Sequence, residues 1–236
     1  MNKLYLVATP IGNLGDITLR ALEILRSVSL IACEDTRVTG KLLSHYQIKT
    51  KLVSYHQHSG SGRVDWLIDY LKNQGDLALV TDAGTPGIAD PGNQLVAEAV
   101  ARLGEEVEII PLPGASALAA ALSISGMPTD RFIFWGFLPH KKGKETIIKK
   151  IIAGELTSVF YESTHRIIKT LEKIKELMSA AAAGSGETMP GGAKKKIMVC
   201  RELTKKFETI YRGDIDQVLN SLKNDNSKGE FTVIIS

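Results

Sequence analysis

Apolar runs alternate along the chain with segments in which apolar residues recur at helical spacing. The apolar runs predict strands at residues 4–7, 30–33, 51–55, 77–80, 107–110, 131–135, 158–161, 197–200 and 231–235. The segments between them predict helices at residues 16–25, 39–46, 63–73, 94–103, 115–123, 144–152, 166–177 and 215–222, with Asp16 as the expected N-cap of the first. Because strands that alternate with helices are typical of βαβ units, we predict an α/β protein, with a largely parallel sheet formed by the strands up to residue 110.

A domain boundary is predicted where two prolines flank Leu112, because they favour an extended connector before the next helix. We therefore expect an N-terminal α/β domain at residues 1–112 and a C-terminal α/β domain at residues 113–236. Residues 178–193 are small, Gly-rich and without periodicity. We expect them to form a flexible insertion in the second domain.

Three loops rich in Pro and Gly follow predicted strands, at residues 8–13, 81–92 and 111–117. Ligands of open α/β sheets bind beyond the carboxyl ends of the strands. None of these loops has the glycine spacing of a phosphate-binding loop, a dinucleotide fingerprint or a nucleophile elbow. Their close-packed backbone groups suit an adenine edge and an amino-acid tail, and Asp82 would favour a nearby cation.

The net charge of +3 conceals an asymmetry between the two halves of the chain. Residues 1–112 carry 10 Lys and Arg against 13 Asp and Glu, whereas residues 113–236 carry 19 against 13. The excess lysines gather at residues 141–144, 149–150, 194–196 and 205–206. Such clusters suit a phosphate-rich partner, although a solvated surface is the equally ordinary alternative.

The remaining composition favours a cytoplasmic protein without a metal. Cys33 and Cys200 lack the spacing of a disulfide framework or a metal site, so we expect buried thiols. The pair His56 and His58 has no third ligand nearby in the sequence and is expected to be surface polar structure. The N-terminus leads directly into the first strand without a signal-peptide pattern, and no apolar run is long enough to span a bilayer.

Several motifs together resemble one enzyme family. They are VATPIGNL at 7–14, DIT at 16–18, EDTR at 34–37, TDAGTPGIADPG at 81–92, PLPG at 111–114, GFLP at 136–139, FYESTHR at 160–166, RELTK at 201–205 and KGEF at 228–231. In this order they resemble the tetrapyrrole-methylase-type S-adenosylmethionine-dependent methyltransferases, and most of all the ribosomal RNA branch of that family. The chain stops just after its last predicted strand, where many relatives continue into a helical extension. The resemblance therefore does not predict how this chain binds RNA.

The resemblance implies a fold, a cofactor, a reaction and a partner. The fold would be two α/β domains with mostly parallel or mixed sheets and S-adenosylmethionine in the cleft between them, usually in a homodimer. The reaction would transfer a methyl group to the ribose 2′-hydroxyl of a cytidine in 16S ribosomal RNA of the small subunit. Cofactor contacts are expected from Pro10, Asp82, Ala83, Gly84, Thr85, Ile88, Ser116, Ala117, Tyr161, Leu203 and Thr232.

A ribose hydroxyl is a weak nucleophile, so a base that removes its proton would accelerate the transfer. The candidates in the family motifs are Glu34, Asp35, Glu162, His165 and Glu202, of which Asp35, Glu162 and His165 are the predicted catalytic residues. The alternative for the glutamates is a role in helix capping or ion pairing. Cations in the same motifs predict RNA contacts at Arg37, Arg166 and Lys205.

Two other functions stay open at this stage. A methyltransferase for a small tetrapyrrole would need an apolar, macrocycle-sized cleft, which the charged segment at residues 34–37 suits poorly. A non-catalytic RNA-binding or ribosome-assembly factor would retain the cofactor pocket as a scaffold only.

Overall fold

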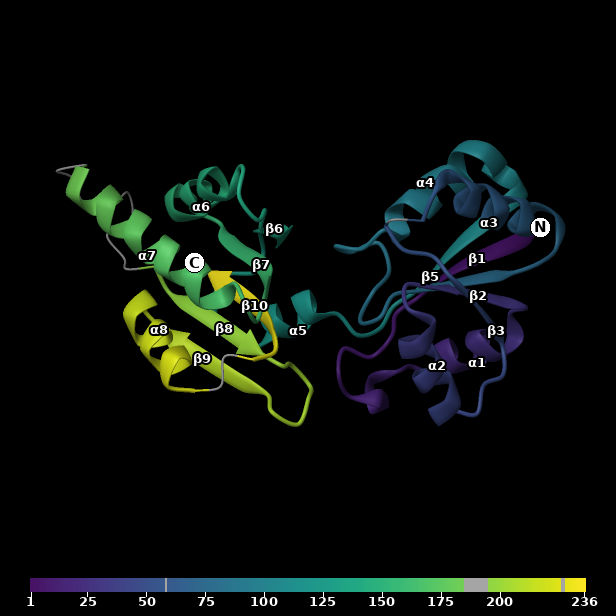
Figure 1. Ribbon diagram of the computed structural model, residues 1–236, viewed down its shortest axis with the longest axis horizontal. Helices are drawn as coiled ribbons and strands as arrows, with labels where there is room; N and C mark the ends of the chain where they lie inside the picture. Colours follow the sequence, from purple (N-terminus) through teal and green to yellow (C-terminus); the bar gives the residue numbers. More distant parts are fainter. Residues whose placement is uncertain (58, 185–194, 226–227) are drawn as a thin grey trace. The chain divides into compact units, whose positions relative to one another are not determined.

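In the computed structural model the chain divides into two compact units, unit 1 (Met1–Ser116) and unit 2 (Ala117–Ser236). The structure describes residues 1–57, 59–184, 195–225 and 228–236 (Figure 1). The division falls a few residues after the predicted boundary at residue 112. Within the described residues, no helix combines the length and the apolar character needed to cross a membrane.

Unit 1 is built on a parallel sheet of five strands in the order β3-β2-β4-β1-β5. The strands are β1 (Asn2–Val7), β2 (Leu30–Cys33), β3 (Lys51–Ser54), β4 (Leu77–Val80) and β5 (Val107–Leu112). The helices are α1 (Leu19–Ser27), α2 (Thr36–His45), α3 (Ser61–Asn73) and α4 (Gly92–Leu103), with short 3-10 turns η1 (Leu14–Asp16) and η2 (Gly104–Glu106). The predicted parallel α/β architecture is confirmed here.

Alternate residues of the strands in unit 1 pack on opposite faces of the sheet, as the period of two requires. Leu77 and Leu79 of β4 pack with side chains of α3 and α4. Ala78 and Val80 pack with side chains of α1 and α2. All four residues of β4 are buried, because helices cover both faces of this central strand. This explains why its sequence is continuously apolar.

Unit 2 contains a mixed sheet in the order β6-β7-β10-β8-β9. The strands are β6 (Phe132–Phe137), β7 (Thr157–Ser163), β8 (Ile197–Arg201), β9 (Thr209–Gly213) and β10 (Glu230–Ile235). The helices are α5 (Ala117–Ser123), α6 (Lys144–Ala153), α7 (Ile167–Gly184) and α8 (Ile215–Asn224). Among its described strands, β6 and β7 pair in parallel and the other three pairings are antiparallel, which confirms the mixed sheet that the family resemblance implied.

Three details of the predicted elements are wrong. The N-cap of α1 is Thr18, whose hydroxyl accepts from Ala21 N, whereas Asp16 lies in the preceding 3-10 turn. Residues 178–184 belong to α7, so the expected flexible insertion does not begin at Met178. The rest of that predicted insertion, residues 185–193, lies outside the described residues. Strand β9 was not predicted at all.

Candidate functional site

The loops after β1 and β4 are joined where these neighbouring strands end. Thr9 N donates to Gly84 O at 2.9 Å, and Gly84 N donates to Thr9 O at 3.0 Å. The buried Thr9 hydroxyl donates to Thr81 O at 3.0 Å. Gly84 has a φ of +89°, which favours glycine, and an added Cβ would lie 3.4 Å from an Ile11 methyl group. The two loops are therefore fixed to each other by main-chain contacts.

The loop after β5 packs against the loop after β1. Ala8 N donates to Leu112 O at 3.4 Å, and the Thr85 hydroxyl of the second loop donates to Ala115 O at 3.1 Å. A Cβ added to Gly114 would lie 2.9 Å from the Cβ of Ala8, closer than side chains approach each other. We call residues 8–13, 81–92 and 111–116 the three-loop platform. It lies at the carboxyl edge of the sheet of unit 1.

The predicted cofactor residues of unit 1 lie on this platform. Ala83 and Ile88 are exposed, whereas Gly84 is buried. Pro10, Thr85 and Ser116 are half-buried. The platform thus presents backbone groups, small side chains and the large exposed apolar side chain of Ile88, and suits a ligand held by main-chain hydrogen bonds.

Three carboxylates gather at the ends of β2 and β4, namely Asp82 of the platform and, beside it, Glu34 and Asp35. Asp82 Oδ1 accepts from Asp35 N at 3.0 Å, and Glu34 Oε2 accepts from the Thr81 hydroxyl at 3.1 Å. Burial raises the pKa of Asp82, and the charges of Glu34 and Asp35 raise it further. Such a group of like charges favours a cation nearby.

Asp35 and Arg37 form a local pair at the start of α2. Asp35 is the N-cap, and its Oδ1 accepts from Arg37 N at 2.8 Å. Its carboxylate also binds the Arg37 guanidinium, with Nη2 at 2.6 Å from Oδ2 and Nε at 3.0 Å from Oδ1. These hydrogen bonds lower the pKa of Asp35 to about 2. A carboxylate with so low a pKa accepts a proton poorly, which weakens the case for Asp35 as a general base.

Glu162 lies at the centre of a buried polar cluster in unit 2. Its side chain is 0% exposed. Oε1 accepts from Ser163 N at 2.9 Å and lies 3.1 Å from Arg166 Nε, and Oε2 accepts from the Thr170 hydroxyl at 2.7 Å. Lys144 Nζ donates to the same hydroxyl at 2.7 Å. Hydrogen-bond donors therefore surround the Glu162 carboxylate, which is the usual arrangement of a buried charge with a structural role.

Arg166 connects this cluster to the segment after β6. Its Nη2 donates to Leu138 O and, at 3.2 Å, to Pro139 O. Its side chain is 17% exposed. His165, in contrast, is exposed in the turn between β7 and α7. Of the two neighbours predicted for catalysis and RNA binding, only His165 has its side chain in solvent.

The predicted cofactor residues of unit 2 line the middle and one end of its sheet. The Tyr161 hydroxyl accepts from Leu118 N, next to Ala117, at 3.1 Å, and burial raises the pKa of Tyr161. Thr232 is buried opposite Tyr161 in the β7–β10 pairing. Leu203 is also buried, between Glu202 and Thr204, whose φ values are +53° and +65°. Two such residues in one turn indicate a backbone held under constraint.

Lys205 is bound by two carboxylates at the same end of the sheet. Its Nζ lies 2.9 Å from Glu202 Oε1 and 2.8 Å from Glu230 Oε2. Burial lowers the pKa of Lys205, but the hydrogen bonds to Glu230 and Glu202 outweigh this effect and raise it. Each of the three predicted RNA-binding cations, Arg37, Arg166 and Lys205, is thus already paired with an acidic side chain.

Some residues with a structural role in the site were not predicted. Thr9 joins two loops, and Thr170 and Lys144 complete the cluster around Glu162. Lys144 belonged to a lysine cluster that suggested surface charge, but its side chain is only 18% exposed. Hydroxyl groups such as these carry no sequence pattern of their own, because their partners are distant along the chain.

No metal site is apparent in the part of the chain that the structure describes. There, no group of three His, Cys, Asp or Glu side chains has the arrangement of metal ligands. His58 of the predicted surface pair lies outside the described residues. Cys33 and Cys200 are buried free thiols, as predicted.

The fold and these motifs define a class of methyltransferase. The chain belongs to the tetrapyrrole (corrin/porphyrin) methylases, whose family model matches residues 3–219. The methyl donor of this family is S-adenosylmethionine, so the chain is an S-adenosylmethionine-dependent methyltransferase.

Several proteins with a more specific name are similar to essentially the whole chain. Ribosomal RNA small subunit methyltransferase I of Synechocystis sp. is 45% identical over 238 residues, which cover 100% of this chain and 79% of that protein. The protein of the same name from Escherichia coli O157:H7 is 43% identical, covering 99% and 77%. That from Thermotoga maritima is 39% identical over 236 residues, covering 100% and 99%.

Solved structures share the fold at low identity. A diphthine synthase superposes with a TM-score of 0.71 at 15% identity, covering 100% of this chain and 90% of that one. A cobalt precorrin-4 methyltransferase superposes with a TM-score of 0.65 at 16% identity, covering 99% and 94%. These similarities establish the two-unit α/β fold and nothing about the substrate.

Proposed function

We propose that this chain transfers a methyl group from S-adenosylmethionine to the ribose 2′-hydroxyl of a cytidine in small-subunit ribosomal RNA. The observation that carries the proposal is the match, over essentially the whole chain, to proteins named ribosomal RNA small subunit methyltransferase I. The tetrapyrrole enzymes resemble the chain only in fold, at about one residue in six identical for the cobalt precorrin-4 methyltransferase.

The three-loop platform fits the cofactor. S-adenosylmethionine, when bound, supplies a methyl group on a positively charged sulfur. Gly114 is exposed and has no side chain, so a ligand can approach the main chain there. The exposed side chain of Ile88 offers an apolar contact, and Asp82 with its acidic neighbours favours the positive charge. We propose that the cofactor contacts in unit 1 are Pro10, Asp82, Ala83, Gly84, Thr85, Ile88 and Ser116. The contacts at Ala117, Tyr161, Leu203 and Thr232 stay a prediction.

Methyl transfer from a sulfonium is an in-line displacement, so the protein must hold the acceptor oxygen behind the methyl group and exclude water. Among the three predicted catalytic residues, His165 is the best candidate for the base. Asp35 has a pKa of about 2, and Glu162 is enclosed by donors, whereas His165 is exposed and imidazole is the commonest general base. In this mechanism His165 would take the 2′-hydroxyl proton as the methyl carbon–oxygen bond forms and the methyl carbon–sulfur bond breaks, with S-adenosylhomocysteine as the leaving group. Glu162 is a positioning residue that holds Arg166 and the adjoining turn.

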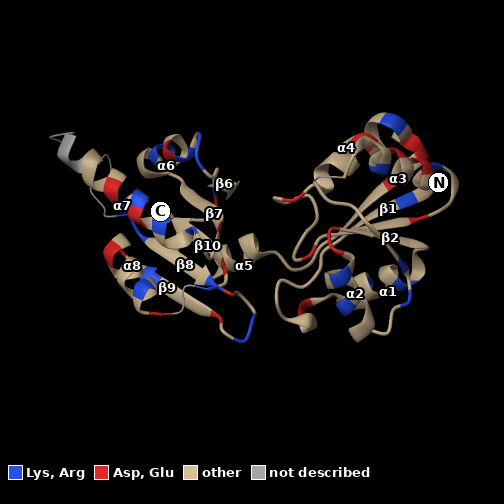
Figure 2. Cartoon of the chain, in the orientation of Figure 1, with Lys and Arg blue, Asp and Glu red and all other residues tan. Residues whose placement is uncertain are grey.

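The proposed RNA partner calls for cations that are not already neutralised. The segment joining β8 and β9 carries Lys206 and Phe207, and in Figure 2 its lysines lie beyond the ends of the two strands. Lys206 Nζ lies 5.6 Å from the centroid of the Phe207 ring, which is 65% exposed. An exposed ring beside a cation suits an unpaired base next to a phosphate. We therefore place RNA contacts at Lys206 and Phe207 ahead of the paired Arg37, Arg166 and Lys205.

The proposal includes a homodimer and a cytoplasmic location. Strand β6 lies at one edge of its sheet and pairs, among the described strands, with β7 alone. Phe132, Ile133 and Phe137 of this strand are 40%, 37% and 56% exposed. Exposed apolar edge strands favour pairing with another chain, which supports a second copy here. The two buried free thiols suit a reducing compartment.

Labelled methyl transfer tests the proposed function. The purified protein is incubated with S-adenosylmethionine carrying a tritiated methyl group and one of three acceptors. These are unmodified small ribosomal subunits, small subunits already methylated by the same protein, and a uroporphyrin-type tetrapyrrole. Label should enter only the unmodified subunits. Label in the tetrapyrrole would overturn the assignment of substrate, and cofactor binding without transfer to any acceptor would favour a non-catalytic RNA-binding factor.

A further inference from the structure

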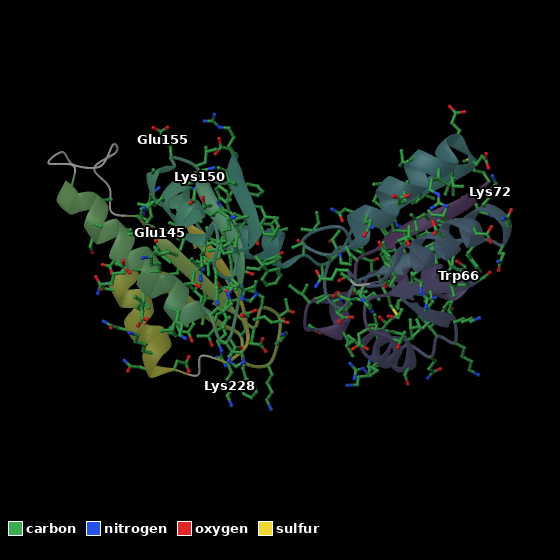
Figure 3. All side chains as sticks on the ribbon, turned by 45° about the horizontal axis from the view of Figure 1, so that its top comes forward. Trp66, Lys72, Glu145, Lys150, Glu155 and Lys228 are labelled. Carbon is green, nitrogen blue, oxygen red and sulfur yellow. The ribbon has the colours of Figure 1, made fainter. Side chains whose placement is uncertain are left out.

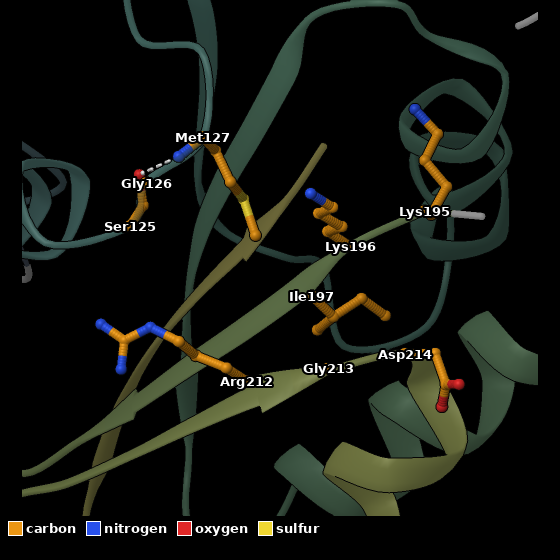
Figure 4. A pocket seen from close by; sticks show the side chains of 9 residues that line it. All are labelled: Ser125, Gly126, Met127, Lys195, Lys196, Ile197, Arg212, Gly213 and Asp214. Carbon is orange, nitrogen blue, oxygen red and sulfur yellow. Dashed lines mark hydrogen bonds between the residues drawn. The ribbon is translucent and has the colours of Figure 1, made fainter. Parts of the chain in front are cut away.

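A basic pocket lies at the end of the unit 2 sheet that is opposite to the segment at residues 201–205. It has a volume of about 410 Å³ and is formed by the loop at 125–127, the start of β8 at 195–197, and the end of β9 with the next residue at 212–214 (Figure 4). Ile197 and Arg201 are the first and last residues of β8. At about 3.3 Å per residue, β8 separates the pocket from that segment by roughly 13 Å.

The charge of the pocket is positive. Lys195, Lys196 and Arg212 line it, against a single acidic residue, Asp214. The Asp214 carboxylate is the N-cap of α8 and accepts from Asp216 N and Gln217 N at 3.1 and 2.9 Å. It is therefore occupied by the helix, and in Figure 4 it points away from Lys196 and Arg212.

The three cations differ in how far protein groups already occupy them. Lys196 is exposed, and among the described residues its ammonium group has no hydrogen-bond or ion-pair partner. Arg212 is also exposed and uses Nη2 for Ile124 O at 2.8 Å, which leaves its other N–H groups available. Lys195 is only half-exposed, its Nζ donates to Gly154 O at 2.7 Å, and burial lowers its pKa.

The space between these cations has an apolar side. The Met127 side chain extends between Lys196 and Arg212, and Ile197 lies below it (Figure 4). The Ser125 hydroxyl accepts from Met127 N at 3.1 Å, which fixes the loop that carries the methionine. Cations around an apolar surface suit a sugar and its phosphates, because the sugar face packs on carbon while the oxygens bind the cations.

We propose that this pocket binds the sugar–phosphate backbone of the RNA substrate at nucleotides away from the reacting ribose. The inference rests on the proposed function, since only a polymer extends from the motif segment at residues 201–205 to the far end of β8. One phosphate per about 3.4 Å of a strand means that roughly four nucleotides cover that length. The pocket therefore contributes to the affinity and register of the RNA and takes no part in methyl transfer.

Salt dependence of RNA binding tests the pocket directly. The variants are Lys196→Ala and Arg212→Gln, and Lys72→Ala is the matched control because Lys72 is an exposed lysine on α3 of unit 1 (Figure 3). Binding of an unmodified small-subunit RNA fragment is measured by fluorescence anisotropy between 50 and 200 mM salt. Each lost contact should reduce the slope of log affinity against log salt by about 0.7, or roughly a threefold difference in Kd over this range.

The outcomes separate this inference from the proposed function. Both pocket variants should raise KM for small subunits and leave kcat and the Kd of S-adenosylmethionine unchanged, whereas Lys72→Ala should change none of these values. If wild-type protein methylates the RNA but the pocket variants match Lys72→Ala in slope and KM, the inference is wrong and the proposed function stands. If the pocket variants lose binding of inorganic pyrophosphate with the RNA slope unchanged, the pocket is a small-anion site and the inference is again wrong. Wild-type protein that methylates no RNA would contradict the proposed function instead.

Discussion

Gly114→Ala tests whether the three-loop platform is packed as described. The new Cβ would lie 2.9 Å from the Cβ of Ala8, and neither atom belongs to a flexible side chain that can rotate away. The loop after β5 must therefore move away from the loop after β1. Overpacking of this kind costs about 1–3 kcal/mol. If the cofactor bridges these loops, the same cost weakens S-adenosylmethionine binding by about 5- to 150-fold.

The assay is isothermal titration of S-adenosylmethionine together with thermal unfolding. Gly62→Ala is the matched control, because an added Cβ there meets nothing within 4 Å and the residue lies in the first turn of α3. That change should leave cofactor affinity unaltered and should not lower the melting temperature, since alanine favours a helix over glycine. Wild-type affinity in Gly114→Ala, with an unchanged melting temperature, would refute the description of the platform.

Three further predictions concern the ionisable residues. Glu162→Gln removes the charge from a buried pair with Arg166, which should lower the free energy of unfolding by about 3 kcal/mol. In a calorimetric scan the melting temperature should fall by roughly 6–12 °C. A fall of less than a degree would contradict the buried cluster. Because the pKa of Asp35 is lowered to about 2, its contribution to stability is present above the ordinary aspartate pKa of 3.8 and is lost as the pH falls through about 2. Carbon NMR titration should therefore find a midpoint near 2 that moves up in Arg37→Gln, and an unmoved midpoint would exclude Arg37 as its cause. His165→Ala should lower kcat by about 10²- to 10⁴-fold without changing cofactor affinity, whereas an equal loss of cofactor binding would assign His165 a structural role.

The platform was predictable because of the topology of parallel sheets. Apolar runs at residues 4–7, 77–80 and 107–110 predicted three strands, and the carboxyl ends of parallel strands meet at one edge. The structure places β1 between β4 and β5, so their loops are direct neighbours. Each of these runs is apolar enough to identify its strand without tertiary information.

Strand β9 and the flexible insertion show where local pattern was insufficient. Thr209–Gly213 is a short edge strand with only Tyr211 buried, so its sequence lacks a strong apolar signal. Residues 178–184 continue α7, and four of the seven are alanine, which favours a helix even without amphipathic spacing. Composition suggested a loop there, whereas helix propensity was the stronger effect.

The roles of the charged residues were the least predictable part of the site. Arg166 and Lys205 lie in segments that suggested RNA contacts, yet their partners include Leu138 O and Glu230, far along the sequence. Their nearest acidic partners, Glu162 and Glu202, are only four and three residues away, but such spacing alone does not show that the side chains pair. Only the tertiary structure shows which cations are neutralised.

Mass spectrometry of the methylated RNA tests the central claim most directly. Unmodified small ribosomal subunits are treated with the protein and S-adenosylmethionine, and the RNA is digested first to fragments and then to nucleosides. We predict a gain of one methyl group in a single fragment, recovered as 2′-O-methylcytidine. A methyl group on a base, on a different nucleoside, or on no part of the RNA would contradict the account.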